Sequence, residues 1–538
     1  MKNYLDDLPV ISINKLIIFV TVFLILFDNQ AFFSNILEIY PINLKNSLFL
    51  VSVVLVFSGF IVLMLTMVSF KYTVKPALIS VLLISSVTSY FMDSYNAIID
   101  TSMIHNTLHT DVAETLDLMS FKLLLYTLFL GLIPSYLVYK TPVFVATGLQ
   151  EIKSRLVLFI VTLLSVMVLI YIFSSFYSSF FREHKSLRYY SNPASYIYSS
   201  VKYFGEMYKG SQQPLKEIGT DADIPKTDVY RELVIFVVGE TARADRFSLN
   251  GYSRETNPLL KKEQVVSFTN FWSCGTSTAV SVPCMFSIYN TSEFDINTGK
   301  STENVLDVLK HAGVNLLWLD NNSSSKGVAD RIEYQSYKGP EKNSACDMEC
   351  RDIGMLENIQ SYINGHPYGD IVIVLHQMGQ HGPAYYKRYP PEFEKFTPVC
   401  KTNQLEECSK EELNNAYDNA ILYTDYFLSK VINTLKLNDK QFETAMIYAS
   451  DHGESLGEKG LYLHGLPNFI APDSQRHVPA IIWIGKSMSD IDLKEVIKVK
   501  NKRYSHDNLF HTLLGLIEIN SVVYDKSMDL LRHRYPDE

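Results

Sequence analysis

Cysteine is absent from the chain before Cys274 and after Cys408. The six cysteines in between fall into three close pairs: Cys274 with Cys284, Cys346 with Cys350, and Cys400 with Cys408. Adjacent pairing is the simplest connectivity, because each bond then closes a short loop, whereas six unrelated free thiols would not be confined to one segment. No histidine lies at zinc-finger spacing beside them, which argues against zinc ligation by these thiols. Three disulfides predict an oxidising compartment.

Basic residues are also in short supply. Lys and Arg total 48 against 57 Asp and Glu, for a net charge of -9. No basic stripe is present, which excludes nucleic acid as an expected partner. A cleavable signal is missing as well, since the apolar run after Lys15 leads into Asp28, Asn29 and Gln30 rather than into small residues.

Long apolar runs are concentrated in the first third of the chain. We predict five membrane spans there, long enough to approach the ~30 Å of a bilayer core. Their residue ranges are 10–33, 47–70, 76–92, 123–138 and 156–181.

The distribution of basic residues predicts the orientation. Lys71, Lys75, Lys140, Lys153 and Arg155 lie in two loops, whereas the loop 93–121 has no Lys or Arg. Basic loops stay inside, so the N-terminus is expected inside and the chain after the fifth span outside, as the disulfides also require. We therefore divide the chain into a five-span membrane domain (1–181), juxtamembrane helices and a linker (182–229), and an outer catalytic domain (230–538).

The outer half alternates short apolar runs with helical patterns. Buried strands are expected at 233–238, 314–319, 371–375, 445–449 and 480–484, and helices at 302–312 and 411–435. This alternation predicts an α/β domain with a mostly parallel sheet flanked by helices on both faces. Ligands bind such sheets at the carboxyl ends of the strands.

Polar side chains follow three of these strands. Glu240 follows the first, Asp451 and His452 follow another, and a segment from His376 to His381 follows a third. Each could be a capped turn, but three together are much less expected by chance. Carboxylate and imidazole groups suit a zinc ion.

A hydroxyl-rich turn lies between Cys274 and Cys284, before an expected helix. Zinc could activate a threonine there as a nucleophile, and the helix N-terminus could bind phosphate oxygens. A Ser/Thr-rich cap without chemistry explains the same residues equally well, so both interpretations stay open at this point.

The chain as a whole resembles a known family, and six short motifs carry the resemblance. They are 239–246 (GETARADR), 274–278 (CGTST), 281–284 (SVPC), 376–379 (HQMG), 381–383 (HGP) and 450–454 (SDHGE). They resemble the lipid A phosphoethanolamine transferases, which include the mobile colistin-resistance enzymes and belong to the alkaline phosphatase and sulfatase superfamily.

The resemblance implies a role for each matching residue. Thr278 is the nucleophile and completes a tight zinc site made by Glu240, Asp451 and His452. His381 and His464 surround the phosphate and a second, weaker metal. Substrate contacts are implied for Asn322, Ser323, Lys326 and Glu454, and lipid-headgroup contacts for Asn106, Thr110 and Glu114. Gln377 stands where the wider superfamily has a metal-binding aspartate, so one firm zinc and a conditional second are expected.

The implied reaction transfers phosphoethanolamine from phosphatidylethanolamine to a lipid A phosphate through a covalent threonine intermediate, and confers resistance to cationic peptides such as polymyxin. The expected enzyme is a monomer in the bacterial inner membrane with its catalytic domain in the periplasm. Three alternatives remain: transfer to a lipopolysaccharide core sugar or of phosphoglycerol to a glycan, hydrolysis, and a metal-stabilised scaffold without catalysis. Five spans favour a lipid substrate over a soluble one.

Overall fold

A computed structural model describes residues 10–109, 112–146, 148–174, 176–177, 180, 185–210, 214–226, 228, 230–488 and 490–532. The chain forms two compact units. The first comprises Met1–Ile104 and Met119–Tyr203, and the second comprises His105–Leu118 and Phe204–Glu538. The short stretch 105–118 therefore packs with the second unit, although it lies in the chain between two apolar helices of the first.

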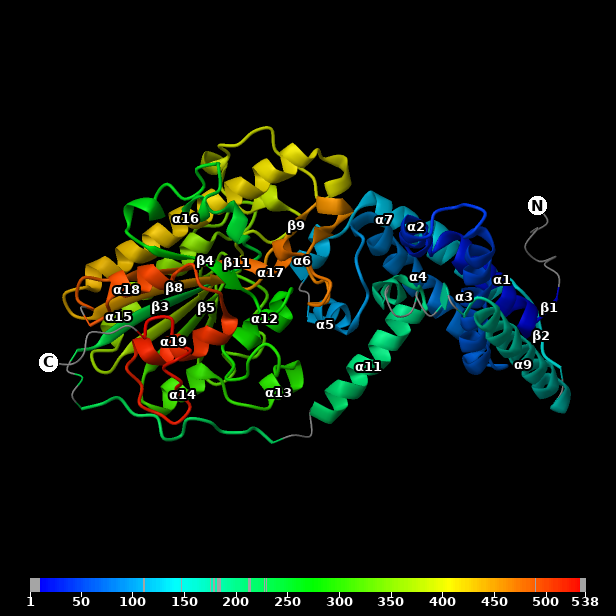
Figure 1. Ribbon diagram of the computed structural model, residues 1–538, viewed down its shortest axis with the longest axis horizontal. Helices are drawn as coiled ribbons and strands as arrows, with labels where there is room; N and C mark the ends of the chain where they lie inside the picture. Colours follow the sequence, from blue (N-terminus) through cyan, green and yellow to red (C-terminus); the bar gives the residue numbers. More distant parts are fainter. Residues whose placement is uncertain are drawn as a thin grey trace. The chain divides into compact units, whose positions relative to one another are not determined.

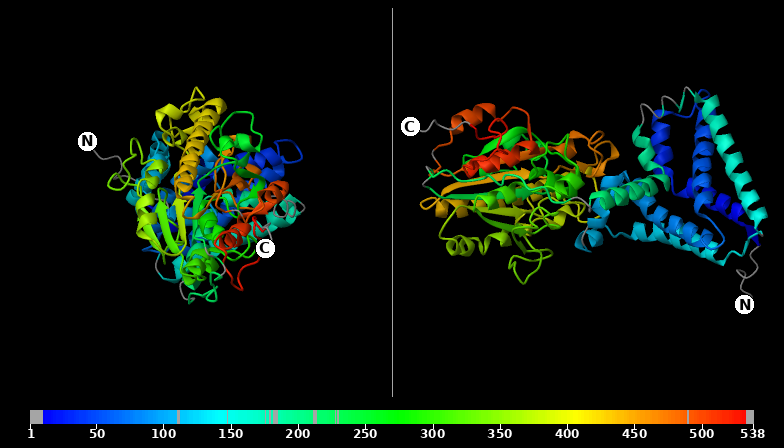
Figure 2. Two further views of the ribbon diagram at one scale, coloured as in Figure 1. Left: turned by 90° about the vertical axis from the view of Figure 1, so that its left-hand side faces the viewer. Right: turned by 90° about the horizontal axis from the view of Figure 1, so that it is seen from below.

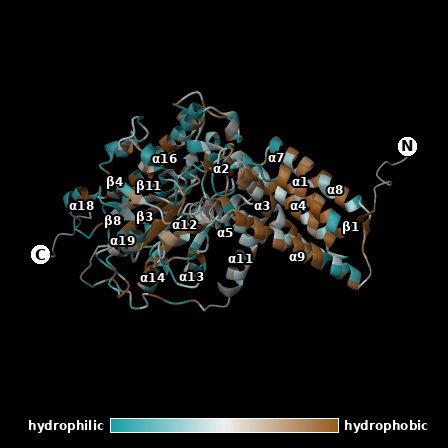
Figure 3. Cartoon of the chain, turned by 45° about the vertical axis from the view of Figure 1, so that its right-hand side comes forward, coloured by the Kyte–Doolittle hydropathy of each residue, from teal (hydrophilic) through white to brown (hydrophobic). Residues whose placement is uncertain are grey.

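Four helical segments of the first unit are long and apolar enough to cross a membrane: α3 (Ser47–Val68), α4 (Val74–Tyr95), the continuous segment Phe121–Lys140 and α9 (Leu149–Ile172). Segment Phe121–Lys140 consists of α7 (Phe121–Tyr126), a π-helical stretch (Thr127–Leu132) and α8 (Ile133–Lys140). Figure 3 shows these helices as largely hydrophobic. Leu156, Val161 and Val168 of α9 are more than half exposed, as expected for side chains that face lipid.

The predicted first span, residues 10–33, falls on a helix pair that is broken. The chain forms α1 (Ile13–Phe27) and α2 (Gln30–Ile39), bent by 58° at the break between them. By length and composition, the described residues therefore contain four candidate spans, or five if this pair counts as one. Asn29 at the break is buried, and its amide donates to the carbonyls of Leu24 (3.0 Å) and Asn192 (2.7 Å). The carbonyl of Leu24 also accepts the backbone amide of Asp28 (3.0 Å), so the Asn29 side chain adds a second hydrogen bond at the end of α1 and joins this end to the carbonyl of Asn192.

The fifth predicted span, residues 156–181, falls on α9, which begins at Leu149 and ends at Ile172. Its first turns carry Glu151, Lys153 and Arg155, which is why an apolar run could not reveal them. The Arg155 guanidinium donates to the carbonyl of Thr66.

An eight-stranded sheet forms the centre of the second unit, in the order β12-β4-β11-β8-β3-β7-β5-β6 (Figure 1). The strands are β3 (Glu232–Gly239), β4 (Val266–Trp272), β5 (Asn315–Asp320), β6 (Glu333–Ser336), β7 (Ile371–His376), β8 (Glu443–Ser450), β11 (His477–Ile484) and β12 (Tyr504–Ser505). Only β11 runs antiparallel to its neighbours. The five predicted strands and the mostly parallel α/β fold are confirmed. The prediction missed β4, β6 and β12, which carry polar residues and are partly exposed.

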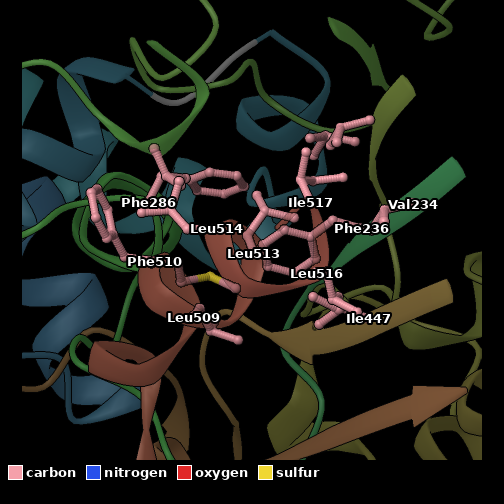
Figure 4. Packing of buried hydrophobic residues seen from close by; sticks show 14 of the residues in the cluster. Val234, Phe236, Phe286, Ile447, Leu509, Phe510, Leu513, Leu514, Leu516 and Ile517 are labelled. Carbon is pink, nitrogen blue, oxygen red and sulfur yellow. The ribbon is translucent and has the colours of Figure 1, made fainter. Parts of the chain in front are cut away.

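Helices cover both faces of this sheet. The 29-residue α16 (Lys410–Asn438) lies over one face, and α14 (Val305–His311) and α19 (Leu509–Leu516) lie over the other (Figure 1, Figure 2). Successive strand residues point to opposite faces, so alternate residues of β3 point toward α19. Figure 4 shows Val234, Phe236 and Ile447 of the sheet near the apolar side chains of α19 in one buried cluster.

Strands β3, β7 and β8 are parallel neighbours, with Gly239 paired to Ser450 and Val238 to His376. Their carboxyl ends therefore lie at one edge of the sheet. The residues that follow these strands, together with the N-terminus of α12 (Thr278–Met285), build the candidate site.

Candidate metal centre and nucleophile

Three ligand-type side chains meet at the carboxyl edge of the sheet. Glu240 follows β3, and Asp451 and His452 follow β8; all three are fully buried. One potential ligand atom from each lies within 4.8 Å of the other two, which is close enough to share a metal ion. The set of two carboxylates and one imidazole suits zinc.

Thr278 is the first residue of α12, and its hydroxyl faces this cluster. Thr278 Oγ1 lies 3.1 Å from Glu240 Oε2 and 3.4 Å from His452 Nε2. Ser277 before it is extended, so the helix begins at Thr278. The first backbone amides of a helix point out of its N-terminal end. The hydroxyl therefore lies beside potential metal ligands at a helix N-terminus, where phosphate oxygens are stabilised.

The electrostatics of the cluster fit a cation. Asp451 Oδ1 accepts hydrogen bonds from the amides of Thr241 (3.1 Å) and His452 (2.6 Å), but within the described part of the chain Asp451 Oδ2 has no hydrogen-bond partner. Burial, followed by the charge of Glu240, raises the pKa of Asp451 well above its usual range. Two buried carboxylates at this separation favour a bound cation between them.

The imidazole of His452 is held in the form that a metal requires. Its Nδ1 lies 2.9 Å from the carbonyl of Gly453, so Nδ1 carries the proton and Nε2 presents a lone pair to the cluster. Burial, and then the neighbouring His464, lower the pKa of His452 to about 3. The histidine is therefore neutral at physiological pH, as a ligand must be.

Asn322 is fully buried in the same cluster. Its amide donates to Glu240 Oε2 (2.8 Å) and to the carbonyl of Gln377 (2.7 Å), so both amide protons are used on the protein. This arrangement orients Glu240. Ser323 is half-buried, and Lys326 Nζ donates to its carbonyl (2.9 Å); the substrate contacts of these residues stay predictions.

His464 lies beside His452 of the metal-type cluster, and His381 lies beside His464; the roles at a phosphate and a second metal that the resemblance implies for both stay predictions. The ring of His464 is centred 4.2 Å from that of His452 and 5.7 Å from that of His381. His464 Nδ1 lies 3.3 Å from Glu454 Oε1, and Glu454 is fully buried. Glu454 thus orients His464, and the substrate contact of Glu454 stays a prediction.

The predicted headgroup residues belong to the stretch 105–118. Asn106 is half-exposed in α5 (Thr101–His109). Thr110 lies outside the described residues, as does the side chain of Glu114 in α6 (Val112–Asp117). Asp117 at the end of α6 forms ion pairs with Lys387 (2.5 Å) and Arg388 (3.0 Å) of the same unit.

Asp352 is an organising residue that the sequence did not reveal. This buried carboxylate accepts from the side chains of Asn321 (2.8 Å) and Gln377 (3.2 Å) and from the amides of Met378 (2.8 Å) and Gly379 (3.2 Å). It therefore shapes the loop between His376 and His381, and it engages the Gln377 side chain. No motif marks a lone aspartate after Cys350.

Gly379 allows this loop to approach the cluster. Its φ is +52°, and a Cβ there would lie 2.7 Å from the carbonyl oxygen of Glu240. Any other residue would push the loop away from the metal-type ligands.

All three predicted cysteine pairs are bonded: Cys274–Cys284, Cys346–Cys350 and Cys400–Cys408. The first encloses Thr278. No free cysteine remains.

The fold and the cluster beside Thr278 define an enzyme of the alkaline phosphatase and sulfatase superfamily. A family model described as Sulfatase matches residues 232–519, and one described as Phosphoethanolamine transferase EptA/EptB matches residues 57–208. The chain belongs to the phosphoethanolamine transferase family and is a transferase.

Relatives match nearly the whole chain. It is 43% identical over 524 residues to the phosphatidylethanolamine transferase Mcr-2 of Escherichia coli, covering 95% of this chain and 96% of the relative. It is 40% identical over 514 residues to the phosphoethanolamine transferase EptA of Escherichia coli K12, covering 94% of each.

A solved structure has the same architecture. The integral membrane protein lipooligosaccharide phosphoethanolamine transferase A of Neisseria meningitidis superposes with a TM-score of 0.94 at 35% identity, over 98% of this chain and 100% of that chain. The match includes both the membrane helices and the sheet domain.

Proposed function

We propose that this enzyme transfers phosphoethanolamine from phosphatidylethanolamine to a phosphate of lipid A, in the bacterial inner membrane with its catalytic unit in the periplasm. The names of Mcr-2 and of the Neisseria protein support a phosphatidylethanolamine donor and a glycolipid acceptor. The apolar helices support a substrate that lies in the membrane.

The observation that carries the proposal is the position of the Thr278 hydroxyl, between Glu240 and His452 at the start of α12. In the first step, Thr278 Oγ forms a bond to the donor phosphorus while the bond from phosphorus to the diacylglycerol oxygen breaks. The hydroxyl loses its proton, and the departing diacylglycerol oxygen takes one up. Thr278 then carries phosphoethanolamine.

Glu240, Asp451, His452 and Thr278 would hold one zinc ion. When bound, zinc lowers the pKa of a coordinated hydroxyl and offsets negative charge on phosphoryl oxygens. His381 and His464 would hold a second ion conditionally, because both are neutral ligands and Gln377 supplies no charge.

His381 and His464 are the candidates for moving the proton. Both rings lie close to the cluster, and His464 is oriented by Glu454. A histidine in this position can protonate the leaving oxygen in the first step and accept a proton in the second.

In the second step, an oxygen of the acceptor phosphate bonds to phosphorus and the Thr278 Oγ–phosphorus bond breaks. Any proton on the attacking oxygen is lost, and Thr278 Oγ takes one up, which restores the hydroxyl. The product gains an ammonium group, which weakens its attraction to cationic peptides such as polymyxin.

Mass spectrometry of lipid A from cells with and without this protein tests the proposal. An added phosphoethanolamine unit on a lipid A phosphate is the expected result. A unit on a core sugar instead would support the alternative acceptor, and ethanolamine phosphate released to water would support hydrolysis. Unmodified lipid with no release would favour the scaffold.

A further inference from the structure

Two arginines flank one tryptophan on the second unit. The guanidinium carbon of Arg503 lies 4.5 Å from the ring centre of Trp272, and that of Arg476 lies 5.7 Å from it. The ring of His477 stacks on Trp272 at 5.0 Å with an interplanar angle of 24°. Trp272 is half-buried and Arg503 is exposed, so this Trp272 cluster is accessible to a ligand.

The cluster lies at the edge of the sheet that carries the catalytic residues. Strand β11 is antiparallel to both β8 and β4, so β4 ends at the same edge as β8. Trp272 is the last residue of β4, and Arg476 directly precedes β11. Trp272 pairs with His477, and the amide of Ser273 donates to the carbonyl of Arg476 (2.8 Å).

Asn468 connects the cluster to the segment that carries the nucleophile. Its amide donates to the carbonyl of Cys274 (2.6 Å), and its own carbonyl accepts from Arg476 Nη1 (2.9 Å). Thr278 follows Cys274 within the same disulfide loop. The guanidinium of Arg476 is therefore two hydrogen bonds from the turn that leads into α12.

Within the described residues, neither arginine of the Trp272 cluster has an acidic partner. Within the part of the chain that the structure describes, neither Arg476 nor Arg503 forms an ion pair with a carboxylate, although acidic residues outnumber basic ones in the chain. Two further lysines, Lys500 and Lys502, precede Arg503 in the chain. Cation–π contact with Trp272 stabilises each guanidinium, and a bound anion would offset the positive charge that the cluster carries.

We propose that Trp272, Arg476 and Arg503 bind a phosphate monoester of the acceptor lipid at the rim of the catalytic site. This inference rests on the proposed function. Guanidinium groups bind phosphate through paired hydrogen bonds, and a phosphate monoester carries nearly two negative charges at neutral pH. The donor headgroup instead has one phosphodiester charge and an ammonium that the arginines would repel. The acceptor therefore fits the cluster better than the donor.

The test separates the two substrates with the purified full-length enzyme in detergent. Diacylglycerol release from phosphatidylethanolamine is measured first without acceptor and then with increasing lipid A, and modified lipid A is counted by mass spectrometry. Arg476→Gln and Arg503→Gln should each raise the KM for lipid A about tenfold, the loss expected for one pair of charge-assisted hydrogen bonds. In both glutamine variants, the ratio of acceptor-dependent turnover to donor-only turnover should fall below the wild-type ratio. Arg503→Lys, which keeps the positive charge, should have a ratio between those of Arg503→Gln and the wild type.

Lys494→Gln is the matched control, because it removes an exposed positive charge from α18 (Leu493–Val499) outside the cluster. An unchanged KM for lipid A in both arginine variants would overturn the inference. So would an equal loss of donor-only turnover, since the cluster would then serve the donor or the fold.

A binding measurement keeps the two proposals distinguishable. Trp318 and Trp483 are buried, so Trp272 is the half-buried member of the three tryptophans and should dominate ligand-induced changes in fluorescence. In Thr278→Ala protein, lipid A should change the emission, and the added Arg476→Gln and Arg503→Gln changes should abolish the response. If the wild type never modifies lipid A, the proposed function fails. The same titration then still decides the cluster: equal responses with and without the arginines would refute it.

Discussion

The hydroxyl of Thr278 lies 3.1 Å from Oε2 of Glu240, although the two residues are 38 positions apart. The same carboxylate oxygen accepts the amide of Asn322 at 2.8 Å. Oε2 of Glu240 therefore accepts two hydrogen bonds, one from the proposed nucleophile and one from the buried residue that orients the carboxylate. This shared contact is what makes Thr278, rather than a neighbouring hydroxyl, the expected point of attack.

Thr278→Ala should abolish transfer, lowering activity by about a thousandfold or more, while the fold and the zinc content remain. Thr278→Ser should retain measurable activity because the hydroxyl stays. Lipid A mass spectrometry on cells that express each variant at equal levels measures the effect. Ordinary modification by the Thr278→Ala protein would disprove the nucleophile assignment and favour the scaffold alternative.

The two groups of potential ligands should differ in metal retention. Purified protein should keep about one zinc per chain after dialysis, because the site with two carboxylates binds tightly. Asp451→Ala should lose that ion, whereas His381→Ala should keep it and transfer poorly. A second zinc should appear only with excess metal or phosphate. Elemental analysis measures all of this; two zincs retained without phosphate would contradict the argument from Gln377.

The free energy of unfolding should decrease as the pH is lowered, because His506 must stay neutral in the folded protein. This buried histidine accepts from the amide of Cys274 at Nδ1 (3.2 Å) and donates from Nε2 to the carbonyl of Ser450 (3.0 Å), so only the neutral ring fits. Burial lowers the pKa of His506 from 6.5 to about 4. The His506 imidazole binds a proton below about pH 6.5 in the unfolded chain, but only near pH 4 in the folded chain. Stability is therefore complete above about pH 6.5 and decreases by up to about 3 kcal/mol on acidification to pH 4.

Thermal unfolding of the zinc-loaded protein between pH 7.5 and 5 measures this effect. His506→Gln should be less stable than the wild type at pH 7.5, and its stability should decline less steeply as the pH is lowered. Parallel slopes for wild type and His506→Gln would rule out His506 as the source.

The C-terminus should lie outside the cytoplasmic membrane and the N-terminus inside. The reason is the position of Lys71, Lys75, Lys140, Lys153 and Arg155, which lie in loops or at helix ends on the side expected inside. A phosphatase reporter that is active only in the periplasm, fused after Glu538, should be active. An inactive periplasmic fusion together with a fluorescent cytoplasmic one would reverse the topology.

Much of the fold was predictable because buried strands leave a local trace. The runs around β3, β7 and β8 are continuously apolar, and each is followed at once by polar residues of the site. Strand β4, between β12 and β11, left no such trace, because Thr269 and Asn270 interrupt its apolar pattern. The break after α1 was missed for a related reason: the tertiary partner of Asn29, Asn192, is 163 residues away.

The sequence by itself determined which residues follow the parallel strands and which cysteines can close short loops. Those relations are local, since they depend on the order of residues along one strand or one turn. Only the tertiary structure decided that Asn322 orients Glu240, that Asp352 shapes the loop carrying His381, and that Arg476 and Arg503 share Trp272. These contacts join segments that are distant in the chain, and a buried polar group accepts whichever donor the packing brings within reach.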